Sequence, residues 1–279
     1  MQTNQEQTPS KFKIALRSFF EFNITTDDRK ETMTRLIEES RADNTFYIML
    51  FLSTLITVSG LLMDNLVVVL GGMLVAPLLT PILSLGMSMA TTNAVSFRRS
   101  SEIILKSTVL ILFVSIITTV FLNFPSSVTS ESKEILSRSS TDMIALFIAL
   151  IAGLAAAFAW AKPKMSASLP GVAVAASILP PLVVAGIGLA YLQRDVFLGA
   201  FQLFFANIII TILASLTIFS LFGFFTVRKE EEKKIKEEIK EINEEKKEIA
   251  KEIVKEEKME QSLNNRKKRT VKKTKKTAK

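Results

Sequence analysis

"GGMLVAPLLTPILSLGM", residues Gly71 to Met87, is an apolar run that carries two prolines, Pro77 and Pro81, four residues apart near its middle. A proline inside a helix removes one backbone donor and disrupts the bond to the carbonyl four residues earlier. In a bilayer each unpaired backbone group is costly, because no water is present to replace the lost bond. The run is therefore either no membrane span at all, or a broken span whose break faces protein, water or a ligand.

The composition is that of a membrane protein with polar flanks. Of 279 residues 48% are hydrophobic, while the charged residues gather at the two ends and in a few short connections. The chain has no cysteine and no histidine, which excludes disulfides, thiol chemistry, Cys/His metal sites and imidazole catalysis. No Ser-His, Asp-Asp or metal-binding set stands out, so we expect no enzyme activity, no cofactor and no metal site.

Six stretches have roughly the 20 apolar residues that a membrane span needs. They are Phe46–Met63, Leu66–Ala90, Ile103–Phe124, Met143–Ala161, Leu169–Tyr191 and Val196–Phe225. As core helices of a soluble protein they would keep almost no polar face, so the pattern favours six transmembrane helices.

Lysine and arginine in the short connections set the expected orientation. They fall on one side of the six spans: Arg29, Lys30, Arg35, Arg41, Arg98, Arg99, Lys162, Lys164, Arg228 and Lys229. Under the positive-inside rule this side and both termini are cytoplasmic. We expect a multi-pass protein of the cytoplasmic (plasma) membrane whose first span directs insertion, because residues 1–10 lack the pattern of a secretory signal.

The two halves of the membrane region align with each other. With Gly71 placed over Gly171, Pro81 meets Pro181 and Gly86 meets Gly186. Three spans per half is an odd number, so the second half enters the membrane from the opposite side. Secondary transporters build binding sites at the bilayer midplane from such inverted repeats with interrupted helices. The sequence thus predicts an all-α inverted 3+3 repeat, residues 46–124 and 142–225, with proline-broken second and fifth helices meeting at mid-membrane.

The candidate solute or ion path consists of the prolines and the polar side chains at depth. These residues are Pro77, Thr80, Pro81, Ser84, Ser177, Pro180, Pro181, Gln202 and Asn207. Asn207 is the strongest candidate, because a primary amide in lipid needs partners; it could face the broken helices or join two helices. In the alternative interpretation the prolines only kink helices, and nearby Ser and Thr hydroxyls satisfy the freed carbonyls.

Charged residues lie at the ends of the predicted spans and not at their centres. Carboxylates and bases inside the membrane mark proton relays, so their absence argues against a classical proton-driven transporter. A centre lined by hydroxyls and carbonyls suits a monovalent ion, an anion held at helix N-termini, or a small uncharged solute.

The flanks of the membrane domain (46–225) are predicted to be cytoplasmic. In residues 1–45, Lys11–Phe22 has the pattern of an amphipathic helix in the membrane interface. Asp27–Asn44 reads as a second helix, opened by a capping box of Asp28 and Glu31.

Residues 226–263 form a highly charged segment with an isoleucine seam. Ile235, Ile239, Ile242, Ile249 and Ile253 alternate at spacings of four and three or seven, which predicts a cytoplasmic coiled coil of three or more strands and a homo-oligomer. The alternative is a single solvated helix held by pairs such as Glu232 with Lys236.

The tail 264–279 contains nine Lys and Arg and no acid, in a chain whose net charge is +8. We expect it to be disordered and to meet anionic lipid; without an aromatic or a fold to position it, nucleic acid is disfavoured.

The segments "DNLVVVLGGMLVAPLLTPILSLGMSMA" (Asp64–Ala90) and "LPGVAVAASILPPLVVAGIGLAYL", followed by "LFFANIIITILASL", resemble the signature regions of an uncharacterised hydrophobic family, domain of unknown function 389. The resemblance runs from about Arg41 to Phe225 and implies a multi-span membrane protein of bacteria and archaea, without an assigned activity. Many relatives carry a soluble domain before the spans, where this chain has only residues 1–45. Two functions follow: a channel or transporter for an ion or small solute, or a membrane scaffold that oligomerises and recruits partners through its coiled coil and tail.

Overall fold

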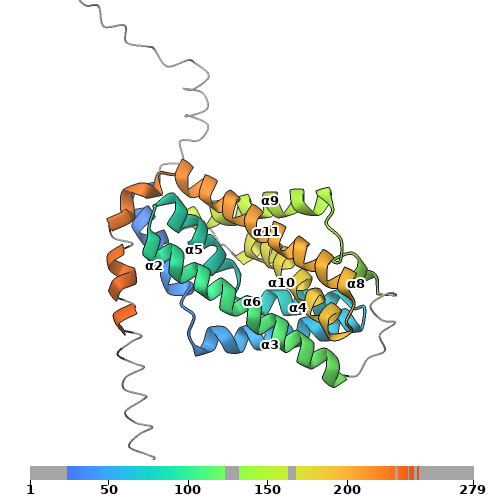
Figure 1. The fold of residues 1–279 in the computed structure, drawn as a ribbon. Coiled ribbons are helices and arrows are strands. Elements are labelled where there is room, and N and C mark those ends of the chain that lie inside the picture. Colours follow the sequence, from blue (N-terminus) through green and yellow to red (C-terminus); the bar gives the residue numbers. More distant parts are fainter. Residues whose placement is uncertain are drawn as a thin grey trace, which may run out of the picture. The chain divides into compact units, whose positions relative to one another are not determined.

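The computed structural model describes residues 24–122, 132–162 and 168–229, together with 232–237, 239–241 and 244. The elements of the first unit, residues 1–231, are α2 (Thr26–Glu39), α3 (Asn44–Leu62), α4 (Leu66–Val75), α5 (Leu79–Ala90), α6 (Ala94–Leu122), α8 (Lys133–Leu136), α9 (Met143–Ala161), α10 (Ser168–Ala190), α11 (Arg194–Leu221) and the 3-10 helix η1 (Phe224–Val227) (Figure 1). The described part of this unit contains no strand, so the predicted all-helical class is confirmed.

The long helices have the length and composition of membrane spans. Four of them, α3, α6, α9 and α11, are each apolar enough to cross a bilayer, and the bent pair α4 and α5 makes a fifth if it counts as one span. The predicted fifth span corresponds to α10, of which the stretch Ser177–Ala190 qualifies as a shorter apolar helix among the described residues. The structure therefore supports four to five spans by these criteria.

The predicted break in the second span is present, with a bend of 54° between α4 and α5. Ala76 ends α4 in an extended conformation (φ −71°, ψ 119°), because the ring of Pro77 disfavours a helical residue before it. Pro81 lies in the first turn of α5, where a backbone N–H has no helical partner to lose. One proline thus ends a helix and the other begins one.

The predicted break in the fifth span is wrong. α10 is a single helix from Ser168 to Ala190 with Pro180 and Pro181 inside it. A hydrogen bond from Asn207 of α11 to the Ser177 carbonyl replaces one of the donors that the prolines remove. The local sequence of α10 does not show this contact.

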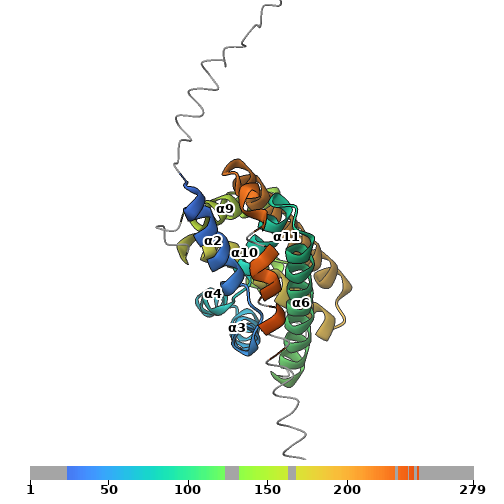
Figure 2. The ribbon, with the colours of Figure 1, turned by 90° about the vertical axis from the view of Figure 1, so that its left-hand side faces the viewer.

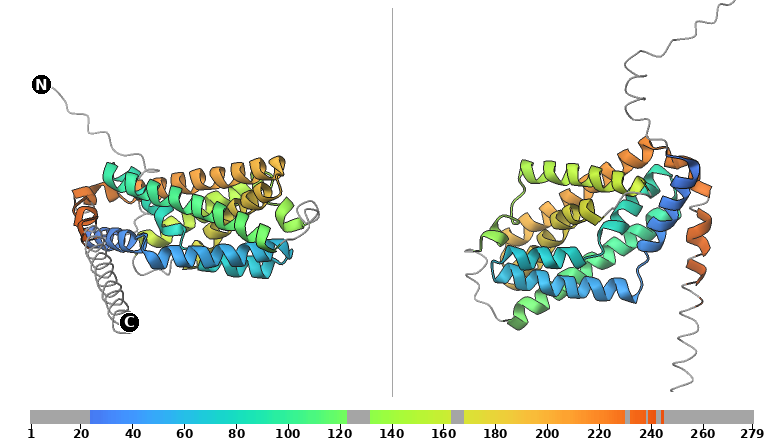
Figure 3. Two further views of the ribbon diagram at one scale, coloured as in Figure 1. Left: turned by 60° about the horizontal axis from the view of Figure 1, so that its bottom comes forward. Right: turned by 180° about the vertical axis from the view of Figure 1, so that it is seen from behind.

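α10 occupies the centre of the bundle. It packs against α11, α6, α9 and α4, and its residues 178–188 are all buried. α3 and α9 lie on opposite sides of the bundle (Figure 3). The surrounding helices turn large apolar side chains outward, such as Phe113 on α6, Phe147 on α9 and Phe205 on α11. An exposed apolar belt of this kind fits a lipid environment.

Helix α2 closes one end of the bundle (Figure 2), where it packs against α5, α9 and η1. Arg29 Nε donates to the carbonyl of Phe222 at 2.9 Å, and the Arg35 guanidinium lies 4.3 Å from the ring centre of Trp160 at the end of α9. The predicted capping box of Asp28 and Glu31 is wrong, because α2 begins at Thr26 and the box is formed by Thr25 and Asp28. The sequence predicts a helix that runs to Asn44, but α2 ends at Glu39. Asn44 is instead the first residue of α3, which Asp43 caps.

Two turns separated by a hundred residues have the same geometry. Thr92, between α5 and α6, has φ 53°, and Leu192, between α10 and α11, has φ 55°. The amide after each residue closes the turn on the preceding helix: Asn93 N donates to Ser88 O at 2.9 Å, and Gln193 N donates to Gly188 O at 2.8 Å. The turn between α3 and α4 has the same form, with φ 50° at Asp64 and Asn65 N donating to Gly60 O at 2.9 Å, so three helix connections share this geometry.

Two helix crossings repeat with the same offset. A Cβ on Gly86 of α5 would overlap the hydroxyl of Ser215 on α11 and approach the carbonyl of Ile212. A Cβ on Gly186 of α10 would overlap Ser115 on α6 and approach the carbonyl of Leu112. Each contact joins one half of the chain to the other, with the roles of the halves exchanged.

Several predictions for the flanks fall outside the described residues: the helix Lys11–Phe22, the seam residues Ile242, Ile249 and Ile253, and the tail 264–279. The second unit begins at Glu232, and its described residues are helical. Within it Lys236 Nζ donates to Glu232 at 2.9 Å, which is the pairing expected of a charged helix.

Candidate functional site

A buried amide lies at the middle of α11. Asn207 is the fourteenth of the 28 residues of this helix and is 2% exposed. Its Nδ2 donates a hydrogen bond of 2.6 Å to the carbonyl of Ser177 in α10. Because a carbonyl oxygen can only accept, this bond fixes which way the amide points. The other amide atom, Oδ1, is buried and has no hydrogen-bond partner among the described residues.

The bond from Asn207 compensates for a proline in α10. Pro181 has no N–H to offer the carbonyl of Ser177 four residues earlier, and Pro180 has none for that of Ala176. Asn207 supplies the missing donor to Ser177 from the neighbouring helix. Neighbouring helices commonly satisfy the groups that proline frees within membranes, which explains why α10 stays helical here.

Four of the nine candidate residues come together at this point, and we call Ser177, Pro180, Pro181 and Asn207 the Asn207 cluster. Both prolines are buried and Ser177 is half-buried. The Ser177 hydroxyl donates to the carbonyl of Val174 at 2.8 Å, so its own oxygen can still accept. Acceptor atoms therefore predominate: the unpaired Asn207 Oδ1, the Ala176 carbonyl that Pro180 leaves without a helical donor, and the Ser177 hydroxyl oxygen.

A cleft of about 330 Å³ opens beside the break between α4 and α5. It is lined by Glu38, Glu39, Arg41, Asp43, Thr45, Phe46, Met49, Val75 and Pro77. The end of α2 and the segment after it supply the charged lining, while α3 and α4 supply an apolar wall. Pro77 thus lies beside the first turns of α3 and close to charged residues.

Thr80 and Ser84 make their contacts at the same end of the bundle as α2. The Thr80 hydroxyl donates to the carbonyl of Glu39, at the end of α2, at 2.9 Å. The Ser100 hydroxyl of α6 donates to the hydroxyl of the buried Ser84 at 3.0 Å. Ser100 follows Arg99 directly in the sequence. Among the described residues no hydrogen bond joins Thr80 or Ser84 to the Asn207 cluster, although Leu78 and Ile82 beside the break lie in the same apolar core as Ile178 and Leu182 of α10.

Gln202 lies on a different face of α11. It is exposed, and the exposed apolar side chains of Leu198, Phe205 and Ile209 follow the same face of the helix. An amide on this outer apolar face does not line the interior of a single chain.

Sequence reasoning missed the polar stripe of α6. Ser96, Ser100, Ser107 and Ser115 are all buried, and Ser115 donates to the carbonyl of Val183 in α10 at 2.8 Å. Ser107 has a buried hydroxyl without a partner in the described structure. The sequence does contain a pattern that predicts this stripe, since spacings of four, seven and eight residues place the serines on one helix face.

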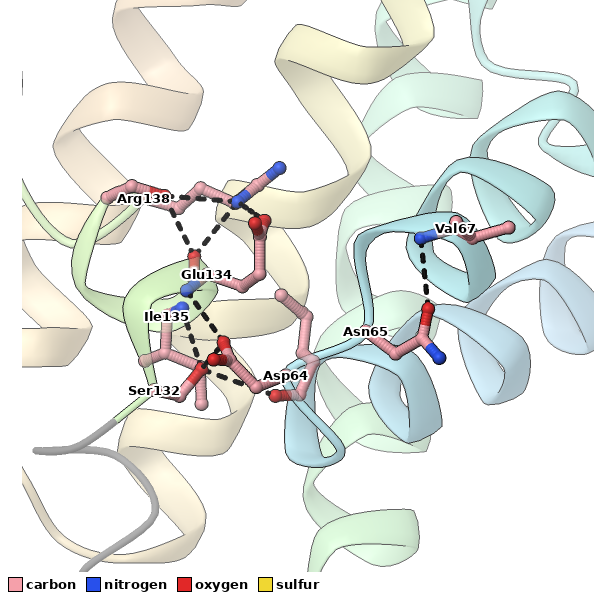
Figure 4. Close-up of polar contacts among 9 residues, drawn as sticks. Asp64, Asn65, Val67, Ser132, Glu134, Ile135 and Arg138 are labelled. Carbon is pink, nitrogen blue, oxygen red and sulfur yellow. Dashed lines mark hydrogen bonds and ion pairs between the residues drawn. The ribbon is translucent and has the colours of Figure 1, made fainter.

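A second missed feature is the contact between Asp64 and α8 (Figure 4). Asp64 Oδ1, in the turn between α3 and α4, accepts hydrogen bonds from the Ser132 hydroxyl at 2.7 Å and from the Glu134 amide at 3.0 Å. The Glu134 amide and the Ser132 hydroxyl lower the pKa of the Asp64 carboxyl below its ordinary value, because both stabilise the charged form. The fully buried Ile135 completes the attachment of α8 to the bundle.

Comparison with known proteins places these features in a family. The family described as Domain of unknown function (DUF389) matches residues 73–213, half of the chain, from α4 to α11. The chain belongs to this family. The DUF389 match contains all nine candidate residues. An uncharacterized protein of Methanocaldococcus jannaschii is 28% identical over 225 residues, which cover 76% of this chain and 68% of that protein. No solved structure matches the chain.

Proposed function

We propose that this DUF389 protein is a channel or transporter for an ion or small solute, with a path that passes the Asn207 cluster. The observation that carries the proposal is the pair of exchanged contacts, Gly86 with Ser215 and Gly186 with Ser115. A rotation that carries Gly86 onto Gly186 must also carry Ser215 onto Ser115. Such an exchange is what a pseudo-two-fold axis between the two halves would produce, and many secondary transporters are built from halves related in this way.

Two helix connections also fall at the same hundred-residue offset, although the connection at Asp64 shares their geometry. The turns at Thr92 and Leu192 reverse the chain at corresponding points of the two halves. We therefore propose an inverted 3+3 repeat of α3 to α6 and α9 to α11, in which α4 and α5 count as one broken span. In this arrangement the broken span and the proline-containing α10 occupy equivalent places.

The position of Asn207 supports a polar path. Halfway along a helix of 28 residues, it lies about 20 Å from either end at 1.5 Å per residue. A polar group at this depth is costly, and in membrane proteins such groups commonly line a path for solute. The cleft beside Pro77 would give access from the end of the bundle that α2 closes. Gln202 is not part of this path, because it faces outward.

We further propose that the end closed by α2 is cytoplasmic. Three basic side chains make contacts there: Arg29 with the Phe222 carbonyl, Arg35 with the Trp160 ring, and Lys162 with the Phe158 ring. The positive-inside rule assigns such an end, and both termini with it, to the cytoplasmic face of the plasma membrane.

A homo-oligomer is part of the proposal. Gln202 is an exposed amide among exposed apolar side chains, and amides join helices within membranes. The isoleucine seam that starts at Ile235 would add a coiled coil of three or more strands. The basic tail would bind anionic lipid near the membrane surface.

The second candidate is a non-transporting scaffold, and one observation favours it. The Thr80 hydroxyl and the Asn207 amide nitrogen each satisfy a backbone carbonyl, as expected if the polar groups only hold helices together. In this case the coiled coil and the tail would recruit cytoplasmic partners.

Cysteine accessibility separates the two candidates, because the chain has no cysteine of its own. We expect Asn207→Cys and Ser177→Cys to react with a small aqueous thiol reagent in membranes. The matched control is Ala214→Cys on the same helix, a buried position that contacts Gly153 of α9 and should stay unreactive. If the two cluster positions react no faster than the control, the scaffold is favoured.

A further inference from the structure

We propose that the Asn207 cluster binds a monovalent cation. This inference rests on the proposed path and names the class of solute that the path would accept. It starts from the Asn207 Oδ1, which is buried at mid-helix without a partner in the described structure. Buried polar atoms are nearly always hydrogen-bonded in folded proteins, so an unpaired one points to a group that occupies the site.

The chemistry of the cluster favours a positively charged occupant. The amide nitrogen of Asn207 donates to the Ser177 carbonyl, so the amide oxygen is the atom left without a partner among the described residues. Pro180 leaves the Ala176 carbonyl without its helical donor. The Ser177 hydroxyl gives its hydrogen to Val174 and presents lone pairs. Oxygen lone pairs in this number replace part of the hydration shell of a cation.

An anion lacks the groups that it would need here. Anions bind at helix N-termini or beside basic side chains, and α10 is unbroken, so it provides no N-terminus at this depth. The one basic residue of α11 is Arg194 at its first position, about 20 Å away at 1.5 Å per residue. The Asn207 cluster therefore lacks, within α10 and α11, the groups that would hold an anion.

A divalent cation is disfavoured for a related reason. Calcium and magnesium ions prefer carboxylate ligands, and the one acidic residue of α11 is Asp195, a full 12 residues before Asn207. Neutral carbonyl and amide oxygens suit ions of a single charge. The occupant is thus a desolvated alkali-metal ion or an ammonium group, and these two sources share the same chemistry.

The test is a binding titration of the full-length protein in lipid nanodiscs. The buffer contains N-methyl-glucamine as an inert cation, and sodium, potassium or methylammonium chloride is added in separate titrations followed by calorimetry and by the thermal unfolding midpoint. We expect saturable binding and a raised midpoint with at least one of the three cations. Replacing chloride with gluconate should leave both readouts unchanged.

Three variants assign the binding to the cluster. Asn207→Leu should weaken it at least tenfold, and Asn207→Asp should tighten it at least tenfold, because a carboxylate adds negative charge at the same size. Pro180→Ala restores a helical donor to the Ala176 carbonyl and should weaken binding severalfold without removing the amide. The control is Thr217→Val, which removes an exposed hydroxyl of α11 bonded to its own helix and should bind as the parent does.

The inference is overturned if none of the cations binds saturably, if Asn207→Leu and Pro180→Ala both bind like the parent, or if the response follows the anion. Transport is tested separately by flux into vesicles. Cation binding without flux would retain the site and reject the transport function. Flux of a neutral solute without cation binding would retain transport and reject the cation site.

Discussion

At the scale of single residues, the central feature is a hydrogen-bond donor on α11 that replaces one missing from α10. Pro181 removes a donor from α10, and Asn207 supplies one from α11. The sequence indicates both halves of this exchange, since a proline in a span frees a carbonyl and an amide in a span seeks a partner. It does not indicate that the two meet, because this depends on how α10 and α11 pack along their length.

This exchange has a measurable energetic signature. We expect Asn207→Leu to lower the free energy of unfolding in detergent by about 1–3 kcal/mol, because the Ser177 carbonyl is left buried without a donor. In a Pro181→Ala background the same change should cost about 1 kcal/mol less, since the alanine N–H restores a helical donor to that carbonyl. Thr217→Val serves as the control and should stay within about 0.5 kcal/mol of the parent. Equal costs of Asn207→Leu in the two backgrounds would show that the amide does not compensate for the proline.

The carboxylate of Asp64 gives a second residue-scale test. Its pKa is lowered by the Glu134 amide and the Ser132 hydroxyl, so the contact is complete above the ordinary pKa of 3.8 and is lost as the pH falls through the lowered value. Asp64→Ala should release α8 at neutral pH, seen as faster hydrogen exchange at the amides of Glu134 and Ile135. Asn65→Ala is the matched control, because Asn65 caps α4 at the same turn. Unchanged exchange in Asp64→Ala would contradict the attachment.

At the scale of elements, the sequence predicts where the helices lie along the chain, but not every contact between them. The six apolar stretches correspond to α3, the α4 and α5 pair, α6, α9, α10 and α11. The break at Pro77 is found because that proline ends a helix locally. The location of Thr80 could not be predicted, since it depends on α2 folding back so that Glu39 presents its carbonyl. Among the candidate residues, Asn207 contacts Ser177 beside the two prolines of α10, whereas Gln202 faces outward.

The two glycine crossings allow a test of the pairing of elements. Gly86→Ala and Gly186→Ala should each destabilise the protein by about 1–3 kcal/mol, because the new methyl group overlaps the serine of the facing helix. Gly71→Ala is the control, since a Cβ there meets no atom within 4 Å. It should be neutral or stabilise by about 0.5–1 kcal/mol, as expected for alanine replacing glycine in a helix. Unfolding in a graded detergent series measures all three variants, and a harmless Gly86→Ala would contradict the crossing.

At the scale of the whole molecule, each half contributes a different part of the path in the proposed arrangement. One half supplies the broken span beside the cleft at Pro77, and the other supplies the unbroken α10 with the Asn207 cluster. The proposed repeat would therefore combine one helix arrangement with different local chemistry in each half. We propose that the face of α11 with Gln202 contacts a second copy of the chain, because it carries an exposed amide among exposed apolar side chains.

This face can be tested through the oligomeric state. We expect Gln202→Leu to shift the protein in mild detergent toward smaller assemblies, because the amide no longer bonds across the interface. Native mass spectrometry measures the distribution, with Thr217→Val as the control that keeps the parent's assembly. If Gln202→Leu leaves the distribution unchanged, this face of α11 does not carry the contact.

The central claim is that solute crosses the membrane past Asn207. Its most direct test is flux into lipid vesicles that contain the purified protein, measured for sodium, potassium, methylammonium, chloride and a small neutral solute, with Asn207→Leu in parallel. We expect flux of a monovalent cation above that of protein-free vesicles, reduced at least tenfold in Asn207→Leu. Flux of none of these solutes above the protein-free level, or equal flux in the parent and Asn207→Leu, would contradict the claim.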